Sequence, residues 1–234
     1  MSFGLSRGRQ LDPGTVGLTA DDLGPLPDDI LSNPAAAHID PRGWFPDPTL
    51  PFELEIGSGK GTFLIQQAAG QPGTNFLGIE WAHEFYAYAA DRLRRRGSPN
   101  VRLLNADAVE FMHWRCPDGI ARVIHLYFSD PWPKSRHHRR RVVQDRFLAD
   151  AHRVLGPGGE LRIVTDHEEY WAWMQEHFAR WCTGSAETDH PLFERRAFDP
   201  PASAAEGELV GTNFERKYKR EGRPFHATSL RKQA

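Results

Sequence analysis

Short apolar runs alternate with longer amphipathic segments between residues 52 and 181. The runs have four to six residues, which is the length of buried parallel strands, and the segments between them carry apolar side chains at helical spacing. The pattern predicts strands over residues 52–56, 76–80, 101–104, 123–128 and 160–165. It predicts helices over residues 62–69, 83–96 and 143–155, a short helix ending near Phe111, and a tryptophan-rich helix after Asp166.

The regular alternation of strands and helices predicts an α/β fold. Strands connected through helices in this way usually run parallel in one sheet, and the helices then cover both of its faces. Beyond residue 190 we expect a strand over residues 192–198 and a last strand over residues 213–219. The complete prediction is a Rossmann-like, seven-stranded, mostly parallel sheet with helices on both faces.

The first 50 residues differ in composition from the rest of the chain. They are rich in Gly, Pro and Asp, and residues 11–50 hold seven Asp and one Arg without sustained periodicity. We therefore predict an irregular acidic arm over residues 1–50 and a globular domain over residues 51–234. No apolar run approaches the roughly 18 residues of a membrane span, and the two cysteines have no CxxC spacing, so we expect a cytoplasmic protein.

The formal net charge of −2 hides two strongly basic segments. Residues 134–141 contain five cations and no acid, and residues 211–234 contain seven Lys or Arg against two Glu. Clustered cations are typical of a surface that binds nucleic-acid phosphates, although a solvated helix start would also explain the first segment. The charge distribution is therefore compatible with an RNA partner, whereas the total charge alone would argue against one.

Each of the five predicted parallel strands ends at or just before a carboxylate. Parallel strands place their carboxyl ends at one edge of the sheet, which is where such sheets bind ligands. Buried strands rarely carry carboxylates, so this edge is predicted to be a polar ligand site. The five residues are Glu55, Glu80, Asp107, Asp130 and Asp166.

Glu55 stands before a Gly-x-Gly-x-Gly turn over residues 57–61. Ordinary turns also use glycines, but here they would let a ligand approach the backbone. The spacing is not the GxGxxG of dinucleotide-binding proteins, and a carboxylate before the turn would repel a pyrophosphate, which disfavours a nicotinamide dehydrogenase. A carboxylate at Glu55 suits an ammonium group, Glu80 has the spacing of an acid that takes ribose hydroxyls, and Asp107 could accept from an adenine amino group. Together these groups predict an S-adenosylmethionine site.

Asp130 follows the apolar run 123–128 and precedes Pro131-Trp132-Pro133. Asp-Pro begins many turns, so Asp130 could be only a turn former. An ionised carboxylate, however, would accept the N1–H and N2–H₂ donors of guanine and would favour the positive charge that forms when N7 is methylated. Trp132 could stack on a guanine taken out of the RNA, or it could belong to the core. The stretch predicts N7 methylation of an RNA guanine, with another purine or an exocyclic amine as the rival target.

The chain resembles the tRNA (guanine-N7)-methyltransferases, a family of class I S-adenosylmethionine-dependent enzymes that methylate guanine 46 in the tRNA variable loop. The resemblance covers roughly residues 52–220. The segments that carry it are Glu55–Gly61, Phe76–Glu80, Asn105–Ala108, Phe128–Lys134, the arginine run to Arg141, Thr165–Asp166 and Thr212–Glu215. The chain departs from the family pattern at Ser129, where proline is common, and at Pro133, where histidine or lysine is common.

The resemblance implies a role for each matching residue, with Asp130 as the catalytic residue. The implied S-adenosylmethionine-binding residues are Glu55, Gly57, Gly59, Glu80, Asp107, Ala108 and Asp130. The implied substrate-binding residues are Lys134, Asp166, Thr212, Asn213, Phe214 and Glu215. The implied RNA-binding residues are Arg136, His137, His138, Arg139, Arg140 and Arg141.

The implied enzyme has tRNA as its partner and S-adenosylmethionine as its cofactor. It needs no metal, and His137 and His138 have no partner at metal-ligand spacing. We expect a monomer or homodimer without an obligatory protein partner. Outside the enzymes, the alternative is a non-catalytic RNA-binding module that has kept the fold, but the five retained acids at the strand ends argue against it.

Overall fold

The computed structural model describes residues 5, 8–184 and 190–233. Helices are labelled α, strands β and short 3-10 helices η. The elements in chain order are η1 (Gly14–Val16), β1 (Gly17–Thr19), η2 (Ala20–Leu23), η3 (Pro34–Ala37), η4 (Pro41–Trp44), β2 (Phe52–Ile56), α1 (Thr62–Gly70), β3 (Asn75–Ile79), α2 (His83–Arg96), β4 (Val101–Asn105), α3 (Ala108–Trp114), β5 (Ala121–Tyr127), η5 (Ser135–Arg140), α4 (Asp145–Val154), β6 (Leu155–Thr165), α5 (Glu168–Thr183), β7 (Phe193–Arg196), α6 (Asn213–Arg220) and β8 (His226–Lys232).

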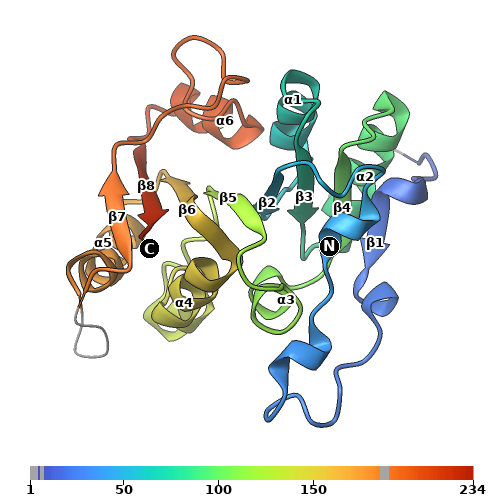
Figure 1. Ribbon diagram of the computed structural model, residues 1–234. Helices are drawn as coiled ribbons and strands as arrows, with labels where there is room; N and C mark the ends of the chain where they lie inside the picture. The colour runs from blue at the N-terminus through green and yellow to red at the C-terminus, as the bar shows by residue number, and fades with distance from the viewer. Residues whose placement is uncertain (1–4, 6–7, 185–189, 234) are drawn as a thin grey trace.

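An eight-stranded sheet runs through the molecule in the order β1-β4-β3-β2-β5-β6-β8-β7 (Figure 1). The strands from β1 to β6 are parallel to their neighbours, and β8 lies antiparallel to both β6 and β7. The five predicted parallel strands and the Rossmann-like fold class are confirmed. Because the strand order reverses between β2 and β5, the carboxyl ends of these two strands flank the point where such sheets bind ligands.

Helices cover both faces of the sheet, with α1, α2 and α6 on one face and α3, α4 and α5 on the other (Figure 1). The sequence of β2 explains how one strand serves both layers, because successive side chains point to opposite faces. Phe52, Leu54 and Ile56 are buried in the large core that α3, α4 and α5 complete. Glu53 and Glu55 therefore face the α1 side, and both are buried.

The structure corrects the prediction for residues 213–219, which form helix α6 instead of a strand. The Thr212 side chain caps the helix by accepting the backbone N–H of Glu215 at 3.0 Å, and cations occupy the last turn. The Thr-x-x-Glu spacing of a capping box is the signal in the sequence that could have found this helix. The last strand is β8, which follows the helix.

The sheet also has eight strands where seven were predicted, because residues 17–19 of the N-terminal arm pair with β4 as strand β1. The described part of the arm otherwise consists of four short 3-10 helices joined by turns and irregular segments, and it packs onto the domain. Phe45 lies buried with its ring 6.2 Å from that of Phe52, and Arg9 pairs at 2.8 Å with the buried carboxylate of Asp91. The domain boundary at residue 50 stays a prediction. Within the described residues, no helix is long and apolar enough to cross a membrane.

Candidate functional site

The parallel strands bring the five predicted acids to one edge of the sheet. Glu55 lies in β2, and each of the other acids follows the last residue of its strand by one to three positions. Burial and then the charge of Glu80 raise the pKa of Glu55. Burial also raises the pKa of Glu80, and the charge of Asp130 adds to that shift. Glu80 is therefore coupled electrostatically to both Glu55 and Asp130 at this edge.

Glu55 has a buried carboxyl oxygen that no described residue pairs with, in contrast to Glu53 in the same strand. Glu53 lies 2.8 Å from the Nε2 atom of His125 and pairs with Arg122. Burial alone would raise the pKa of Glu53, but these two partners outweigh it and the pKa falls below its ordinary value. Among the described residues Oε2 of Glu55 has no hydrogen-bond partner, and burial raises the pKa of Glu55 to about 8. A buried polar atom is rarely left unpaired, so this oxygen marks a place for a polar or cationic ligand group.

The glycine turn after β2 has the open backbone that a ligand site needs. Gly57 has φ of 74°, and a Cβ atom placed there would meet no atom within 4 Å. Gly59 has φ of 52°, and its N–H donates to Oε2 of Glu80 at 2.8 Å. Oε1 of Glu80 accepts from the N–H of Ala82 at 2.9 Å. Glu80 therefore holds the turn in place, and the space beside Gly57 stays open.

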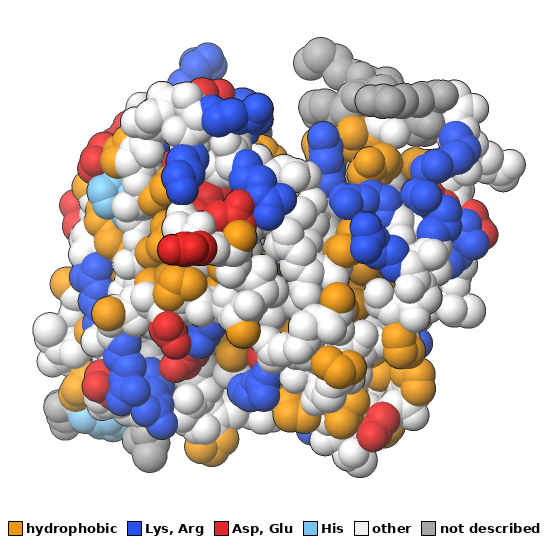
Figure 2. All heavy atoms as spheres, turned by 90° about the horizontal axis from the view of Figure 1, so that it is seen from above, with side chains coloured by type: hydrophobic (Ala, Val, Ile, Leu, Met, Phe, Trp, Pro, Cys, Tyr) orange, Lys and Arg blue, Asp and Glu red, His pale blue; other side chains and the backbone are white. Residues whose placement is uncertain are grey.

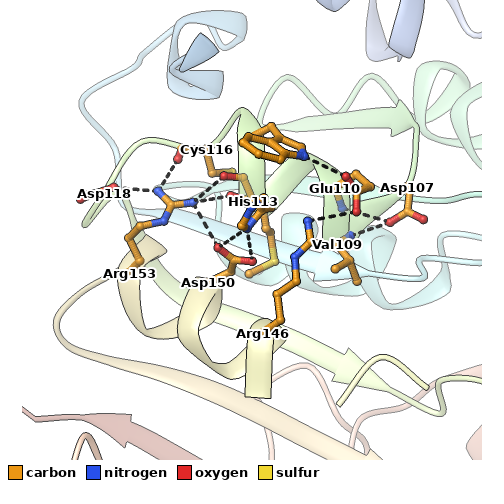
Figure 3. A network of polar contacts seen from close by, with 11 residues as sticks. Asp107, Val109, Glu110, His113, Cys116, Asp118, Arg146, Asp150 and Arg153 are labelled. Carbon is orange, nitrogen blue, oxygen red and sulfur yellow. Dashed lines mark hydrogen bonds and ion pairs between the residues drawn. The ribbon is translucent and has the colours of Figure 1, made fainter. Parts of the chain in front are cut away.

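Asp107 forms the N-cap of α3, directly before Ala108 (Figure 3). Its Oδ1 atom accepts the backbone N–H groups of Val109 and Glu110 at 2.8 and 3.2 Å. The carboxylate is exposed, and Oδ2 is not used by the cap. Asn105, which the sequence reasoning did not single out, donates its amide to the carbonyl oxygen of Glu80 at 2.8 Å and so ties the ends of β3 and β4 together.

A polar network behind Asp107 fixes α3 against α4 (Figure 3). Nδ1 of His113 lies 2.9 Å from Oδ2 of Asp150, which is buried. The Arg153 guanidinium donates to the carbonyl oxygen of Cys116 and to Asp118, both at 2.7 Å. These contacts lie at and just beyond the C-terminal end of α3, so they fix the position of the helix whose N-terminus Asp107 caps.

Asp130 lies in a loop whose backbone is strained on both sides of it. Phe128 and Trp132 have φ of 54° and 43°, a region that bulky residues rarely adopt. The loop is held in this form because the N–H of Phe128 donates to the carbonyl oxygen of Val164 at 2.8 Å, and the carbonyl oxygen of Pro131 accepts from Nε of Arg141 at 2.8 Å. Strain that the surroundings maintain is concentrated at functional sites, and here it presents the exposed carboxylate of Asp130.

Trp132 is half-buried and belongs to none of the three hydrophobic clusters in the described structure. The His137 ring meets it edge-on at 5.8 Å, and the guanidinium of Arg140 lies 5.0 Å from the centre of its ring. The alternative that Trp132 is a core residue is therefore wrong, whereas its stacking on a base stays a prediction.

The cationic loop after Asp130 forms η5 and places most of its charge at the surface. Lys134, Arg136, Arg139 and Arg140 are exposed, and His137 and His138 are half-buried. The RNA-binding prediction for Arg141 needs correction, because its side chain is only 1% exposed. It donates to Glu169 at 2.7 Å and lies over the rings of Tyr170 and Trp173 at 5.3 and 5.2 Å. Arg141 ties the loop to α5 and has no surface to offer RNA.

The four residues 212–215 divide into two that face the site and two that build the helix start. Asn213 donates to the hydroxyl of Thr62 at 2.8 Å, and Phe214 is 43% exposed, with its ring beside Gly59. Glu215 is 1% exposed and its carboxylate accepts three backbone N–H groups. Their donors are Leu209, Val210 and Gly211. Thr212, also buried, is the helix cap, so the substrate-binding prediction for Thr212 and Glu215 is replaced by a structural role.

Asp166, at the end of β6, is already engaged by a residue that the sequence reasoning did not single out. Arg223, in the segment between α6 and β8, donates to Oδ2 of Asp166 at 2.7 Å. The same guanidinium lies 4.2 Å from the centre of the Tyr218 ring. Arg223 therefore connects the C-terminal segment to the edge of the sheet next to Asp130.

The raised pKa of Glu55 predicts a pH-dependent stability. A carboxyl group that is held neutral in the fold stabilises it at pH values below about 4.5, and this contribution is lost as the pH rises through about 8. The free energy of unfolding of the wild type, relative to Glu55→Gln, is expected to fall steadily across this interval. Urea denaturation at a series of pH values measures it, and a difference that does not change with pH would show that Glu55 ionises normally.

Known proteins similar to this chain point to one family. A family model described as a putative methyltransferase matches residues 50–228. The tRNA (guanine-N(7)-)-methyltransferase of Nitrobacter hamburgensis is 39% identical over 178 residues, which cover 76% of this chain and 68% of that protein. The protein of the same name from Agrobacterium fabrum is 33% identical over 226 residues, which cover 94% of this chain and 90% of that protein. The one from Streptococcus mutans is 32% identical over 181 residues, which cover 77% of this chain and 81% of that protein.

Solved structures with low sequence identity share the fold. The aminoglycoside resistance methyltransferase NpmB1 aligns with a TM-score of 0.52 and 15% identity, over 89% of this chain and 94% of that chain. An rRNA methylase from Streptococcus thermophilus aligns with a TM-score of 0.50 and 14% identity, over 79% and 88%. The structural likeness shows only the fold, whereas the relatives described above have higher sequence identity over most of their length. On the evidence of those identities and that coverage, the chain belongs to the tRNA (guanine-N(7)-)-methyltransferase family.

Proposed function

We propose that this protein is a cytoplasmic S-adenosylmethionine-dependent methyltransferase that methylates N7 of guanine 46 in the tRNA variable loop. The observation that carries the proposal is the exposed carboxylate of Asp130, held on a strained loop at the reversal of strand order, at the edge of the sheet that also carries Glu55 and Glu80. Family membership supports the guanine N7 chemistry, and position 46 is what the resemblance of the Asp-Pro-Trp stretch to the family implies.

The residues around the glycine turn fit the methyl donor. The buried Oε2 of Glu55, which no described residue pairs with, suits the ammonium of the methionine end, and the open space at Gly57 lets the ligand contact the backbone. Glu80 would accept from the ribose hydroxyls, and Oδ2 of Asp107, with Ala108 beside it, would accept from the adenine amino group. When bound, S-adenosylmethionine supplies a methyl group on a positively charged sulfur.

Asp130 would recognise the guanine from the side opposite to the reacting atom. Its carboxylate only accepts hydrogen bonds, and the N1–H and N2–H₂ groups are the adjacent donors on the Watson–Crick edge. N7 carries no proton, so no general base is required, and the negative charge of Asp130 favours the cationic ring that forms. Trp132, two residues after Asp130, would stack on the base.

The surrounding polar groups would position the nucleotide and its backbone. Asn213 and Phe214, next to the glycine turn, would contact the guanosine. Asp166 would also contact it if Arg223 moves away from the Asp166 carboxylate or stays bound to one of its oxygens. The exposed cations of the η5 loop would contact tRNA phosphates. They are Lys134, Arg136, Arg139 and Arg140.

Incubation with labelled S-adenosylmethionine and an unmodified tRNA transcript tests the proposal. We expect one 7-methylguanosine per transcript, mapped by mass spectrometry to position 46, and no incorporation when that guanine is replaced by adenine. A methyl group on another base or on an exocyclic amine would contradict the assigned target. Absence of S-adenosylmethionine binding by calorimetry would favour a non-catalytic RNA-binding module.

A further inference from the structure

A groove on the side of the molecule that carries α1, α2 and α6 is lined by cationic side chains. Its volume is about 850 Å³, and the residues that line it are Lys60, Asn213, Arg216, Lys219 and Arg220. Among the described residues, no carboxylate lines it. Figure 2 views this side and shows Lys and Arg side chains gathered over α6 and over α2.

Helical spacing concentrates the charge of the groove on one side of α6. Asn213, Arg216 and Arg220 stand three and four residues apart, so they are neighbours on the helix surface. Lys60 reaches the groove from the glycine turn, between Gly59 and Gly61. Like charges brought together in this way repel one another, and a bound anion would relieve the repulsion.

Contacts within the protein neutralise only part of this charge. Arg216 pairs with Glu208 at 2.6 Å, and Lys219 donates to the carbonyl oxygen of Gly207 at 2.8 Å. In the described part of the chain, no carboxylate lies within ion-pair distance of Lys60, Lys219 or Arg220. Three positive charges therefore remain available to a ligand.

We propose that this groove binds the phosphodiester backbone of the RNA substrate, an inference that rests on the proposed function. The groove opens beside the donor turn, because Phe214 lies against Gly59 and Asn213 is bonded to Thr62 at the start of α1. The η5 loop, which carries the other exposed cations, is tied through Arg141 to Glu169 of α5, a helix that covers the other face of the sheet (Figure 1). RNA bound to both cationic surfaces crosses the carboxyl edge of the sheet, which is where Asp130 lies. The groove is also larger than a single phosphate ion requires.

The salt dependence of tRNA binding tests the groove directly. In the double variant Lys60→Gln/Arg220→Gln, the slope of log Kd against log salt is expected to fall by about 2, one for each lost phosphate contact. The matched control, Lys217→Gln/Arg196→Gln, removes the same charge from exposed positions that do not line the groove, and its slope is expected to stay near that of the wild type. When the groove substitutions are combined with Arg136→Gln/Arg139→Gln in the η5 loop, the decrease in the salt slope is expected to equal the sum of the decreases in the two double variants.

Several results would overturn the proposal. One is an unchanged salt slope in the groove variant, and another is a loss of slope in the control variant that equals the loss in the groove variant. A third is a loss of S-adenosylmethionine affinity, measured by calorimetry, that matches the loss of tRNA affinity. The fourth is displacement of tRNA by excess inorganic phosphate at constant ionic strength.

The proposed function is tested separately, by methylation and tRNA binding of the wild type. If the wild type binds tRNA without methylating guanine N7, the proposed function is contradicted, and the salt slopes still test RNA binding by the groove. If the wild type does not bind tRNA, both proposals are overturned.

Discussion

Replacement of Asp130 by alanine is expected to lower the single-turnover rate of tRNA methylation by about 100- to 1,000-fold, the usual cost of removing one group that stabilises charge in a transition state. The carboxylate of Asp130 is exposed, so its removal leaves no buried partner unpaired among the described residues. The residues with positive φ on either side of it, Phe128 and Trp132, are unchanged in this variant. The affinity for S-adenosylmethionine, measured by calorimetry, is expected to stay within a few-fold of the wild type.

The variant Asp130→Asn separates the two roles of this carboxylate. Asparagine keeps an accepting oxygen and the shape of the side chain but loses the negative charge. A rate close to that of the wild type would mean that Asp130 mainly orients the guanine, whereas a rate close to that of Asp130→Ala would mean that it mainly stabilises the developing positive charge. Glu206→Ala, which removes an exposed acid that is not one of the five at the strand ends, serves as the control. A near-normal rate in Asp130→Ala itself would remove Asp130 from the mechanism.

Replacement of Glu215 by alanine is expected to lower the free energy of unfolding by about 3 kcal/mol, because buried N–H groups that lose their acceptor are costly. The Glu215 carboxylate accepts N–H groups from three consecutive residues in the turn that precedes α6. Without it, this turn and the helix start that carries Asn213 and Phe214 lose their anchor. Urea denaturation measures the loss of stability.

A matched control and the kinetics distinguish this structural role from direct substrate binding. Glu221→Ala removes an exposed carboxylate at the other end of α6 and is expected to change stability by less than about 0.5 kcal/mol. If Glu215 served only to bind guanosine, Glu215→Ala would raise KM for tRNA and leave the denaturation midpoint unchanged. That combination would contradict the role that the structure gives it.

Much of the candidate site could be predicted because its signals are local in the sequence. An apolar run that ends at an acid identifies both a strand and the side chain at its carboxyl end, as for Glu80 and Asp130. A parallel sheet then brings such ends to one edge without further information. The glycine turn was equally readable, because Gly57 and Gly59 adopt the positive φ that glycine favours.

The predictions that needed correction depend on contacts between distant residues. Arg141 belongs by composition to the cationic run, yet Glu169 and two aromatic rings of α5 bury it. The arm residues 17–19 form a strand only because β4 offers them a free edge. Neither partner is recognisable from the local pattern, since the pattern describes a segment and not its neighbours.

The sequence by itself determined the fold class, the edge at which the acids gather and the family to which the chain belongs. Only the tertiary structure decided which of those polar groups are free to act. It pairs Glu53 but leaves Glu55 unpaired in the same strand, and it uses Glu215 to hold a turn while Asp130 stays exposed. The physical reason is that the availability of a charged group depends on its burial and its partners, which are set by packing between elements far apart in the chain.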